Sequence, residues 1–351
     1  MSKTIYSIYD NSPKTEQIST LLGQNNTAKI QLSGLVGSSI SFLIRSLFKK
    51  SELPFVLILN DKEEAAYFLN DLEQMVGDQD VLFYPASFRR PYQIEETDNA
   101  NVLLRAEVLN RINSRKKPAI IVSYPEALFE KVVTRKELDK NTLKVAVGDQ
   151  ISIDFINEVL FEYEFKRVDF ITEPGEFSVR GGIVDVFSFS NDNPYRIEFF
   201  GNEVDSIRTF DVATQLSLEQ QKKIAIIPNV ENKFLQENRE SFLDYISEKT
   251  VICIQNTEGL LSQLDKQFAK AEEAFETLSK DIKHATPEQL FLNQEQFVKR
   301  ALNFSVVELD SKPIFKTIKK FDFHTQPQPS FNKQFDLLLN NLNDNHFNGY
   351  K

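Results

Sequence analysis

The most informative part of the sequence is EPGEFSVRGGIVDVF at residues 173–187, followed by PYRIEFFG at residues 194–201. Apolar and polar residues alternate along the second segment, and a period of two is typical of β-strands. The turn-forming sequence NDNP lies between them at residues 191–194, and a Gly-Asn pair ends the second segment. We therefore predict antiparallel strands joined by short turns.

The second strand has two faces of different character. One set of side chains is apolar and is predicted to join the core: Tyr195, Ile197 and Phe199. The other set combines two charges with an aromatic ring: Arg196, Glu198 and Phe200. Arginine beside an exposed aromatic residue is typical of protein interaction sites. The residues alone leave an alternative equally open, in which Phe200 packs under a neighbouring loop and the arginines pair with Glu198 or Asp185.

Two glycines, Gly181 and Gly182, interrupt the first segment, which we predict as one strand from residue 177 to residue 189. Glycine within a strand indicates a β-bulge or a close approach of two backbones. Either arrangement would direct Arg180 independently of the rest of its strand.

Upstream of this stretch, strand-like runs alternate with segments of helical periodicity. The runs are short and largely apolar, at residues 29–35, 54–59, 81–84 and 119–122. Helical spacing separates them, as in residues 61–76, where Asp61 is the expected N-cap. Strands alternating with helices predict a parallel sheet that is covered on both faces.

A glycine-containing turn follows the first of these strands and opens a helix, which is the position of a phosphate-binding loop. Its sequence is GLVGSSIS at residues 34–41. The turn contains Gly34 and Gly37, but Ser39 stands in the place of a glycine and Ile40 in the place of the lysine, so that Ser41 alone fits the end of the motif. Because isoleucine cannot neutralise a phosphate, we predict a degenerate loop that binds no nucleotide. An unrelated strand–turn–helix corner would explain these residues equally well.

The last third of the chain, from about residue 230, is predicted to be mainly helical. Short strands are expected at residues 250–254 and 305–309, and a helix begins at Thr286 with a capping box completed by Gln289. The predicted fold is thus α/β, with a parallel-sheet domain that resembles P-loop or helicase domains, an inserted α+β antiparallel domain and an α-rich companion domain. Their expected boundaries are residues 1–134, 135–229 and 230–351.

Composition and charge exclude several classes of protein. The 351 residues carry a net charge of −10, which does not favour a general grip on nucleic acid phosphates. The single cysteine, Cys253, excludes disulfides, is expected in the core and favours a reducing cytoplasm. No apolar run reaches the roughly 18 residues of a membrane span, so no membrane partner is expected. The three histidines show no ligand spacing, so we predict no metal site and no catalytic residues.

Three motifs carry a family resemblance. Residues 173–187, residues 194–211 with the following Thr214 and Gln215, and FYPASFRRPY at residues 83–92 resemble the N-terminal module of the bacterial transcription-repair coupling factors. That module is itself similar to the damage-recognition protein UvrB. UvrB-like chains keep an intact phosphate loop and carry a long DNA-clamping hairpin after the tyrosine-rich strand. Here Ile40 breaks the loop, and only residues 88–98 stand where the hairpin would be.

The resemblance implies three domains, called 1A, 2 and 1B in the family, and a role without catalysis. Domain 2 would dock onto UvrA, the recruiter of nucleotide excision repair, and Arg180, Arg196 and Phe200 match positions that the family uses for this contact. It further implies that a C-terminal domain masks this surface in the whole protein. RNA polymerase, double-stranded DNA, ATP and magnesium would bind to domains that follow, so we expect this chain to be cut from a longer DNA translocase.

Two other functions stay open at this point. The first is a UvrB-like, damage-recognising ATPase module, which requires nucleotide binding. The second is a regulatory domain that contacts only another region of its own protein. On the interaction hypothesis, the substitution Arg196→Glu is expected to abolish UvrA binding without unfolding the module.

Overall fold

The computed structural model describes residues 5–24, 27–87, 92, 99–114, 117–189, 191, 193–228, 239–278, 285–309, 312–327 and 329–348. Within these ranges, seven strands form one parallel sheet in the order β17-β1-β16-β15-β2-β4-β3. Their bounds are β1 (Lys29–Ser33), β2 (Phe55–Ile58), β3 (Val81–Tyr84), β4 (Ile120–Ser123), β15 (Val251–Ile254), β16 (Ser305–Leu309) and β17 (Lys319–Asp322). The parallel sheet predicted from the alternation of strands and helices is confirmed.

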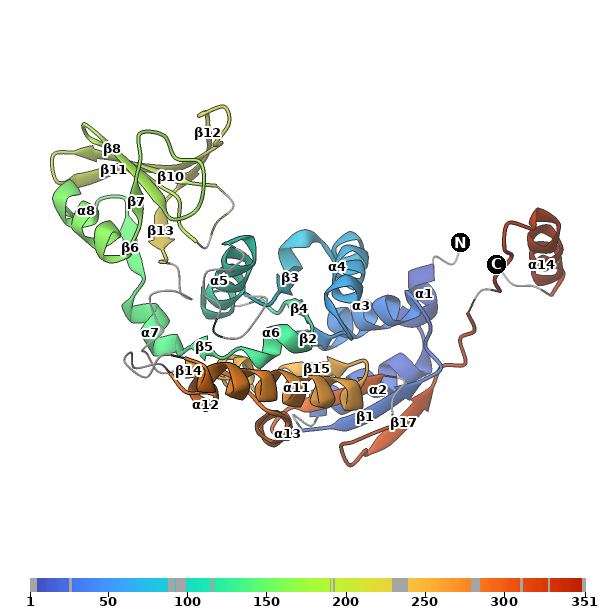
Figure 1. Cartoon of the computed structure of the whole chain (residues 1–351). Helices are drawn as coiled ribbons and strands as arrows, with labels where there is room; N and C mark the ends of the chain where they lie inside the picture. Colours follow the sequence, from blue (N-terminus) through green and yellow to red (C-terminus); the bar gives the residue numbers. More distant parts are fainter. Residues whose placement is uncertain are drawn as a thin grey trace.

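Helices cover both faces of this sheet, with α3 and α4 on one side and α11 on the other (Figure 1). The helices of this body are α1 (Ile5–Asp10), α2 (Pro13–Gln24), α3 (Ser39–Ser51), α4 (Lys62–Val76), α5 (Asn99–Ser114), α6 (Pro125–Phe129), α10 (Phe242–Tyr245), α11 (Thr257–Glu276), α12 (Pro287–Leu290) and α13 (Gln294–Ala301). Every residue of β2, β4 and β15 is buried, as expected for central strands between two helical layers. Cys253 lies on β15 and is fully buried.

The sheet joins segments that we expected in two different domains. Strands β15, β16 and β17 come from the region after residue 230, and they pair in register with β1 and β2 from the N-terminal region. The expected α-rich companion therefore shares its sheet with the N-terminal region. Short strand patterns such as residues 250–254 show that a strand exists, but they do not show which sheet it joins, because pairing is decided by long-range contacts.

The middle of the chain is inserted between two strands that lie side by side. Strand β5 (Val132–Val133) pairs antiparallel with β14 (Arg239–Glu240), and helix α7 (Arg135–Lys140) follows β5 into the insert. Strands β6 (Leu143–Ala146) and β13 (Lys223–Ile226) also pair, where the chain enters and leaves the insert. The insert stands above the parallel sheet in Figure 1. The two ends of the insert therefore lie side by side, where the chain leaves the parallel-sheet body and returns to it.

Six strands in the described portion of the insert form a second sheet in the order β12-β11-β10-β9-β8-β7. They are β7 (Lys166–Arg167), β8 (Glu176–Arg180), β9 (Ile183–Val186), β10 (Tyr195–Phe200), β11 (Glu203–Phe210) and β12 (Ser217–Gln221). All neighbours are antiparallel except β7 and β8. Helix α8 (Ile153–Glu162) covers one face, where the ring of Phe161 meets that of Phe177 edge-on at 5.2 Å between centroids. The predicted α+β insert is confirmed.

The expectation of one strand from residue 177 to residue 189 is wrong. Strands β8 and β9 form a hairpin, and Gly181 and Gly182 are its two-residue turn. Gly181 has a φ of 60°, which an L side chain rarely adopts, so the turn favours glycine there. The expected close approach is present, because the Phe199 amide donates to the Gly182 carbonyl at 2.8 Å. A Cβ on Gly182 would lie 3.1 Å from the Phe199 carbonyl oxygen.

Helix ends follow the sequence signals closely. Asp61 caps α4 by accepting from the Glu64 amide at 2.8 Å, and Thr286 and Gln289 form the expected capping box.

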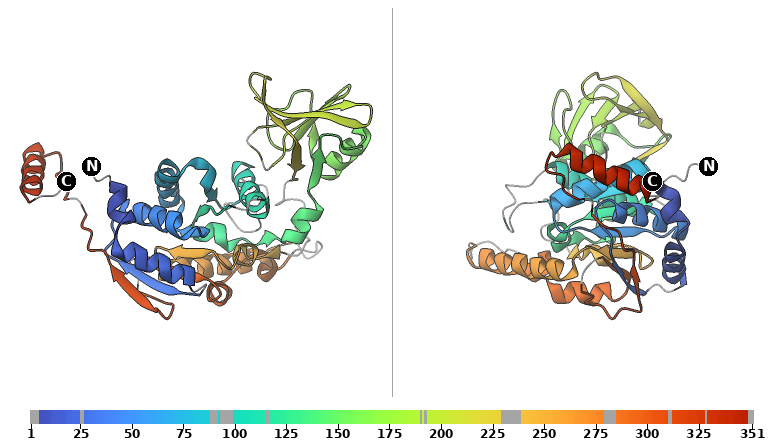
Figure 2. Two further views of the ribbon diagram at one scale, coloured as in Figure 1. Left: turned by 180° about the vertical axis from the view of Figure 1, so that it is seen from behind. Right: turned by 90° about the vertical axis from the view of Figure 1, so that its right-hand side faces the viewer.

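Helix α14 (Phe335–Phe347) buries no residue and stands clear of the described body (Figure 2). No helix among the described residues combines the length and the apolar character that a membrane span requires.

Candidate functional site

The face of the inserted sheet that is not covered by α8 carries a row of polar residues. Cross-strand pairing places Asp185 on β9 between Ser178 on β8 and Arg196 on β10, and Arg196 in turn lies opposite Arg208 on β11. Successive residues of a strand point to opposite faces, so these side chains share one face. The apolar set predicted for the other face is confirmed, because Tyr195 and Ile197 are buried and Phe199 packs against the core.

Asp185 is the centre of this row. Its side chain is 2% exposed and accepts from two arginines. The Arg196 Nε and Nη2 donate to its two oxygens at 2.7 and 2.9 Å, which is a bidentate ion pair. The Arg180 Nη2 donates to one of the same oxygens at 2.5 Å. One buried carboxylate thus fixes both arginines that the sequence singled out.

Arg196 lies mostly inside the fold. Its side chain is 15% exposed, and its guanidinium carbon is 4.3 Å from the ring centroid of Phe210. Its Nη2 also reaches the Gln215 side-chain oxygen at 3.4 Å. The hydrogen bonds to Asp185 are the main cause that raises the pKa of Arg196 above its ordinary value. With these contacts, Arg196 offers a partner protein little free surface.

Phe200 and Arg180 are the exposed residues of the predicted site. Phe200 is 84% exposed at the end of β10, and the Arg180 side chain is 43% exposed at the end of β8. The hydrogen bond between Phe199 and Gly182 ties the end of β10 to the turn that follows Arg180, so both residues lie at the same end of the sheet. The alternative that Phe200 packs under a loop is therefore wrong, whereas pairing of the arginines with Asp185 is found.

Glu198 has a different partner from the one considered in the sequence. It pairs with Arg208 at 2.5 Å and accepts from the Ser206 hydroxyl at 2.7 Å. The hydrogen bond from Ser206 is the main cause that lowers the pKa of Glu198. Both charged side chains of this pair are about 30% exposed, so it forms the polar rim of the face.

One exposed aromatic residue beside the site was not recognised in the sequence. Phe170 is 64% exposed, and the guanidinium carbon of Arg180 lies 5.3 Å from its ring centroid. The sequence around it reads as a strand from residue 165 to residue 171, but β7 ends at Arg167. Periodicity gave no signal for Phe170, because it belongs to a loop whose direction depends on tertiary contacts.

The predicted phosphate loop lies at the other end of the molecule, between β1 and α3. Gly34 has a φ of 69° and Gly37 a φ of 54°. Ile40 is 4% exposed within the core, so its position presents no charge, and Ser41 donates to Asp71 at 3.2 Å. The Ser39 hydroxyl accepts from the Val36 amide at 2.7 Å.

The start of this loop also holds the segment after β17. The Gly34 carbonyl accepts from both the amide and the hydroxyl of Thr325 at 2.7 Å. A side chain at Gly34 would collide with the Asp322 carboxylate and the His324 backbone. These contacts show that Gly34 helps to hold the segment after β17 in place. The absence of nucleotide binding here stays a prediction to be tested, and most of residues 88–98, where the UvrB hairpin would stand, lie outside the described residues.

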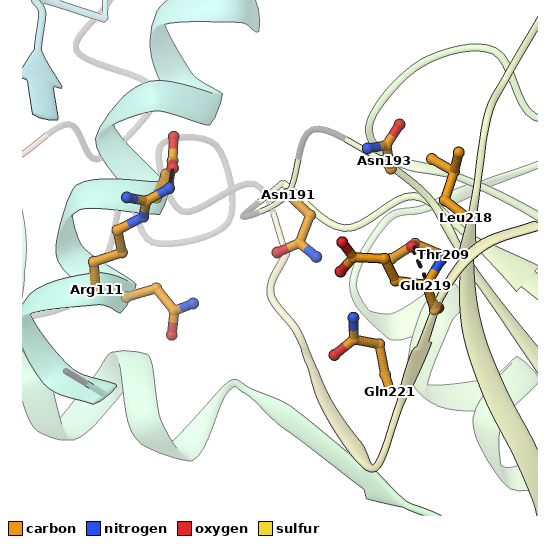
Figure 3. Close-up of a pocket in the computed structure, with 9 residues that line it drawn as sticks. Arg111, Asn191, Asn193, Thr209, Leu218, Glu219 and Gln221 are labelled. Atoms are coloured by element: carbon orange, nitrogen blue, oxygen red, sulfur yellow. Dashed lines mark hydrogen bonds and ion pairs between the residues drawn. The ribbon is translucent and has the colours of Figure 1, made fainter. Parts of the chain in front are cut away.

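A cleft of about 600 Å³ separates α5 from the insert. Figure 3 shows Arg111 of α5 on one side and Leu218, Glu219 and Gln221 of β12 on the other. Its lining is mainly polar, and Arg111 is paired with Glu107 at 2.5 Å. Among the described residues, no group of three or more histidines, cysteines and carboxylates could hold a metal ion.

Comparison with known proteins assigns the insert to a family. Residues 143–231 match the UvrB interaction domain, and they include β6, α8, the whole second sheet and the Asp185 row. The transcription-repair-coupling factor of Bacillus subtilis (strain 168) is 31% identical over 254 residues, which cover 72% of this chain and 20% of that protein. Those of Myxococcus xanthus and Escherichia coli (strain K12) are 29% and 27% identical over 218 and 197 residues.

The matches cover 60% and 56% of this chain in the latter two cases, but only 18% and 17% of the relatives. The chain therefore spans about a fifth of the length of the curated relatives that it matches. The matched region lies in the N-terminal region of those proteins. The chain is thus homologous to the N-terminal region of the transcription-repair-coupling factors, and its residues 143–231 belong to the UvrB interaction domain family.

Proposed function

We propose that this chain is the non-catalytic module of a transcription-repair-coupling factor that recruits UvrA to RNA polymerase stalled at DNA lesions. The observation that carries the proposal is the exposure of Phe200, at 84%, at the same end of the sheet as the half-exposed Arg180 within the UvrB interaction domain. An aromatic anchor beside an arginine is the composition that dominates binding energy in protein interfaces.

The three predicted residues have different roles in this function. Phe200 is the apolar anchor, and Arg180 pairs with a carboxylate of UvrA through the donors that Asp185 leaves free. Arg196 supports the surface from beneath, because Asp185, Phe210 and Gln215 already surround its guanidinium group. The family resemblance suggested direct contacts for all three, so this division of roles is a refinement drawn from their burial.

The remaining activities belong to regions of the parent protein outside this chain. We assign RNA polymerase binding, double-stranded DNA binding and ATP-dependent translocation to those regions, with ATP and magnesium as their ligands. A C-terminal domain of the parent would mask the surface around Phe200 in the resting protein. The burial of Ile40 in the place of the phosphate-loop lysine supports a module without ATP chemistry of its own.

The test is a calorimetric titration of purified UvrA with this chain. We expect Phe200→Ala to weaken binding about 30-fold, which corresponds to the roughly 2 kcal/mol of an interface hot spot. Phe155→Ala is the matched control, because Phe155 is 49% exposed on α8, the helix that covers the opposite face of the same sheet. Equal affinities of the wild type and Phe200→Ala would contradict the proposed site, and no binding by the wild type would contradict the function.

A further inference from the structure

Phe170 is exposed, whereas Ile171, which directly follows it, is buried. Ile171 is buried in a small apolar cluster with Phe187 and Phe210, and Val168 packs against the same cluster. Phe170 takes no part in it and is 64% exposed. A large exposed aromatic ring leaves apolar area in water that another protein can cover.

The loop that carries Phe170 is fixed at both sides. Before Phe170, the Val168 amide donates to the Phe177 carbonyl at 2.9 Å, and the Ser178 hydroxyl donates to the Asp169 carbonyl at 3.2 Å. After it, the Thr172 amide donates to the Glu176 carboxylate at 2.7 Å. A ring on such a loop is preorganised, so that binding costs little additional ordering of the backbone.

Arg180 links this ring to the surface around Phe200. Its guanidinium group lies against the Phe170 ring on one side and donates to the buried Asp185 on the other. The turn that follows Arg180 is bonded to the residue before Phe200. Three exposed side chains from three separate segments therefore gather at one end of the sheet, and no local sequence pattern joins them.

We infer that Phe170 is a third contact residue of the UvrA-binding surface, so that the surface presents one cation between two aromatic rings. The inference rests on the proposed function. The complementary surface of UvrA then has a carboxylate for Arg180, flanked by apolar groups for Phe170 and Phe200. Phe170 adds apolar contact area at the end of the surface that lies away from β10.

The experiment is the titration of purified UvrA with Phe170→Ala, with Phe155→Ala as the control of matched residue type on the opposite face. We expect Phe170→Ala to weaken binding at least fivefold and Phe155→Ala to change it less than twofold. Both variants remove exposed rings, so their urea unfolding midpoints should equal that of the wild type. An affinity of Phe170→Ala within twofold of the wild type, while Phe200→Ala binds weakly, overturns this inference and leaves the proposed function intact.

A double-mutant cycle distinguishes direct contact of Phe170 with UvrA from an indirect effect of Phe170 on the position of Arg180. If Phe170 only held Arg180 in place, Phe170→Ala would have no effect in the Arg180→Ala background. We expect a further weakening of at least threefold in that background, because the ring itself touches UvrA. Loss of that further weakening overturns the contact role of Phe170. Failure of the wild type to bind UvrA overturns the inference and the proposed function together.

Discussion

Asp185 on β9 lies directly opposite Arg196 on β10, and its carboxylate accepts two hydrogen bonds from that guanidinium group at 2.7 and 2.9 Å. Both side chains are largely buried, at 2% and 15% exposure. Arg180 completes the arrangement from β8. The conspicuous arginines of this sheet are therefore tied to one internal carboxylate, and the stability of the insert is coupled to the shape of its exposed face.

The first prediction concerns this buried pair. Asp185→Asn leaves the guanidinium group of Arg196 without its countercharge, which costs about 3 kcal/mol or more for a buried pair. Arg196→Glu places a second carboxylate against Asp185 and should destabilise the insert at least as much. This replaces the expectation, made from the sequence, that Arg196→Glu leaves the fold intact.

Urea unfolding followed by circular dichroism measures both effects. Glu198→Gln is the matched control, because its partner Arg208 lies on the same face but the pair is about 30% exposed. A pair of that exposure contributes less than about 1 kcal/mol. Unfolding midpoints of Asp185→Asn and Glu198→Gln that agree with each other would contradict the structural role of Asp185.

The second prediction concerns pH and Glu176. Burial alone would raise the pKa of this carboxyl, but hydrogen bonds from the amides of Thr172 and Glu173 outweigh it and lower the pKa below its ordinary value. A carboxyl with a lowered folded-state pKa stabilises the fold above its unfolded pKa of about 4.3, and this contribution is lost as the pH falls through the folded value.

Urea unfolding of the wild type and of Glu176→Gln between pH 3 and pH 7 checks this prediction. The difference in stability between the two proteins should be constant above about pH 5 and should shrink as the pH falls below about 4.3. A difference that is the same at every pH would show that the charge of Glu176 does not stabilise the loop that carries Phe170.

The third prediction concerns Cys253. This thiol is fully buried in the central strand β15, and burial raises its pKa above the ordinary value. Because the thiolate is the reactive form, Cys253 should not react with a thiol reagent such as dithionitrobenzoate in the native protein. Absorbance at neutral pH should show one reacting thiol per chain in urea and almost none without it. Rapid labelling of the native protein would contradict the burial of β15.

The fourth prediction concerns the degenerate phosphate loop. A nucleotide at 100 times its dissociation constant would stabilise the protein by about 2.7 kcal/mol. We expect no rise in melting temperature with millimolar Mg-ATP, because the buried Ile40 offers no charge to the phosphates. Mg-ADP and magnesium alone serve as controls. A rise in melting temperature with Mg-ATP would contradict this prediction and favour the alternative of a UvrB-like ATPase module.

Much of the fold could be predicted because local signals and tertiary structure agree. The cap at Asp61, the capping box at Thr286 and the buried run of β2 each depend on neighbours within a few residues. Strand β17 was not predicted, because its sequence, KKFD, has one buried residue between exposed charges. Its pairing with β1 makes it a strand.

Lys29 is a charged residue whose buried position could not be predicted from the sequence. In the sequence it is a charged residue at the start of a strand, but the structure places its ammonium group against the end of α13. It donates to the carbonyls of Ala301, Leu302 and Phe304, and burial lowers its pKa to about 8. Its partners lie more than 270 residues away, so no local pattern could reveal them.

The candidate site divides in the same way. The amino-acid sequence alone predicts the alternation of β10, which puts Phe200 on the face opposite the core. It indicated a bulge or a close approach at Gly181 and Gly182, but not the turn that they form after Arg180. The folded chain alone shows that Arg196 is largely buried, that Phe170 lies against Arg180 and that Asp185 pairs with both arginines. Strand alternation is a property of the local backbone, whereas burial and ion pairing depend on which strands become neighbours.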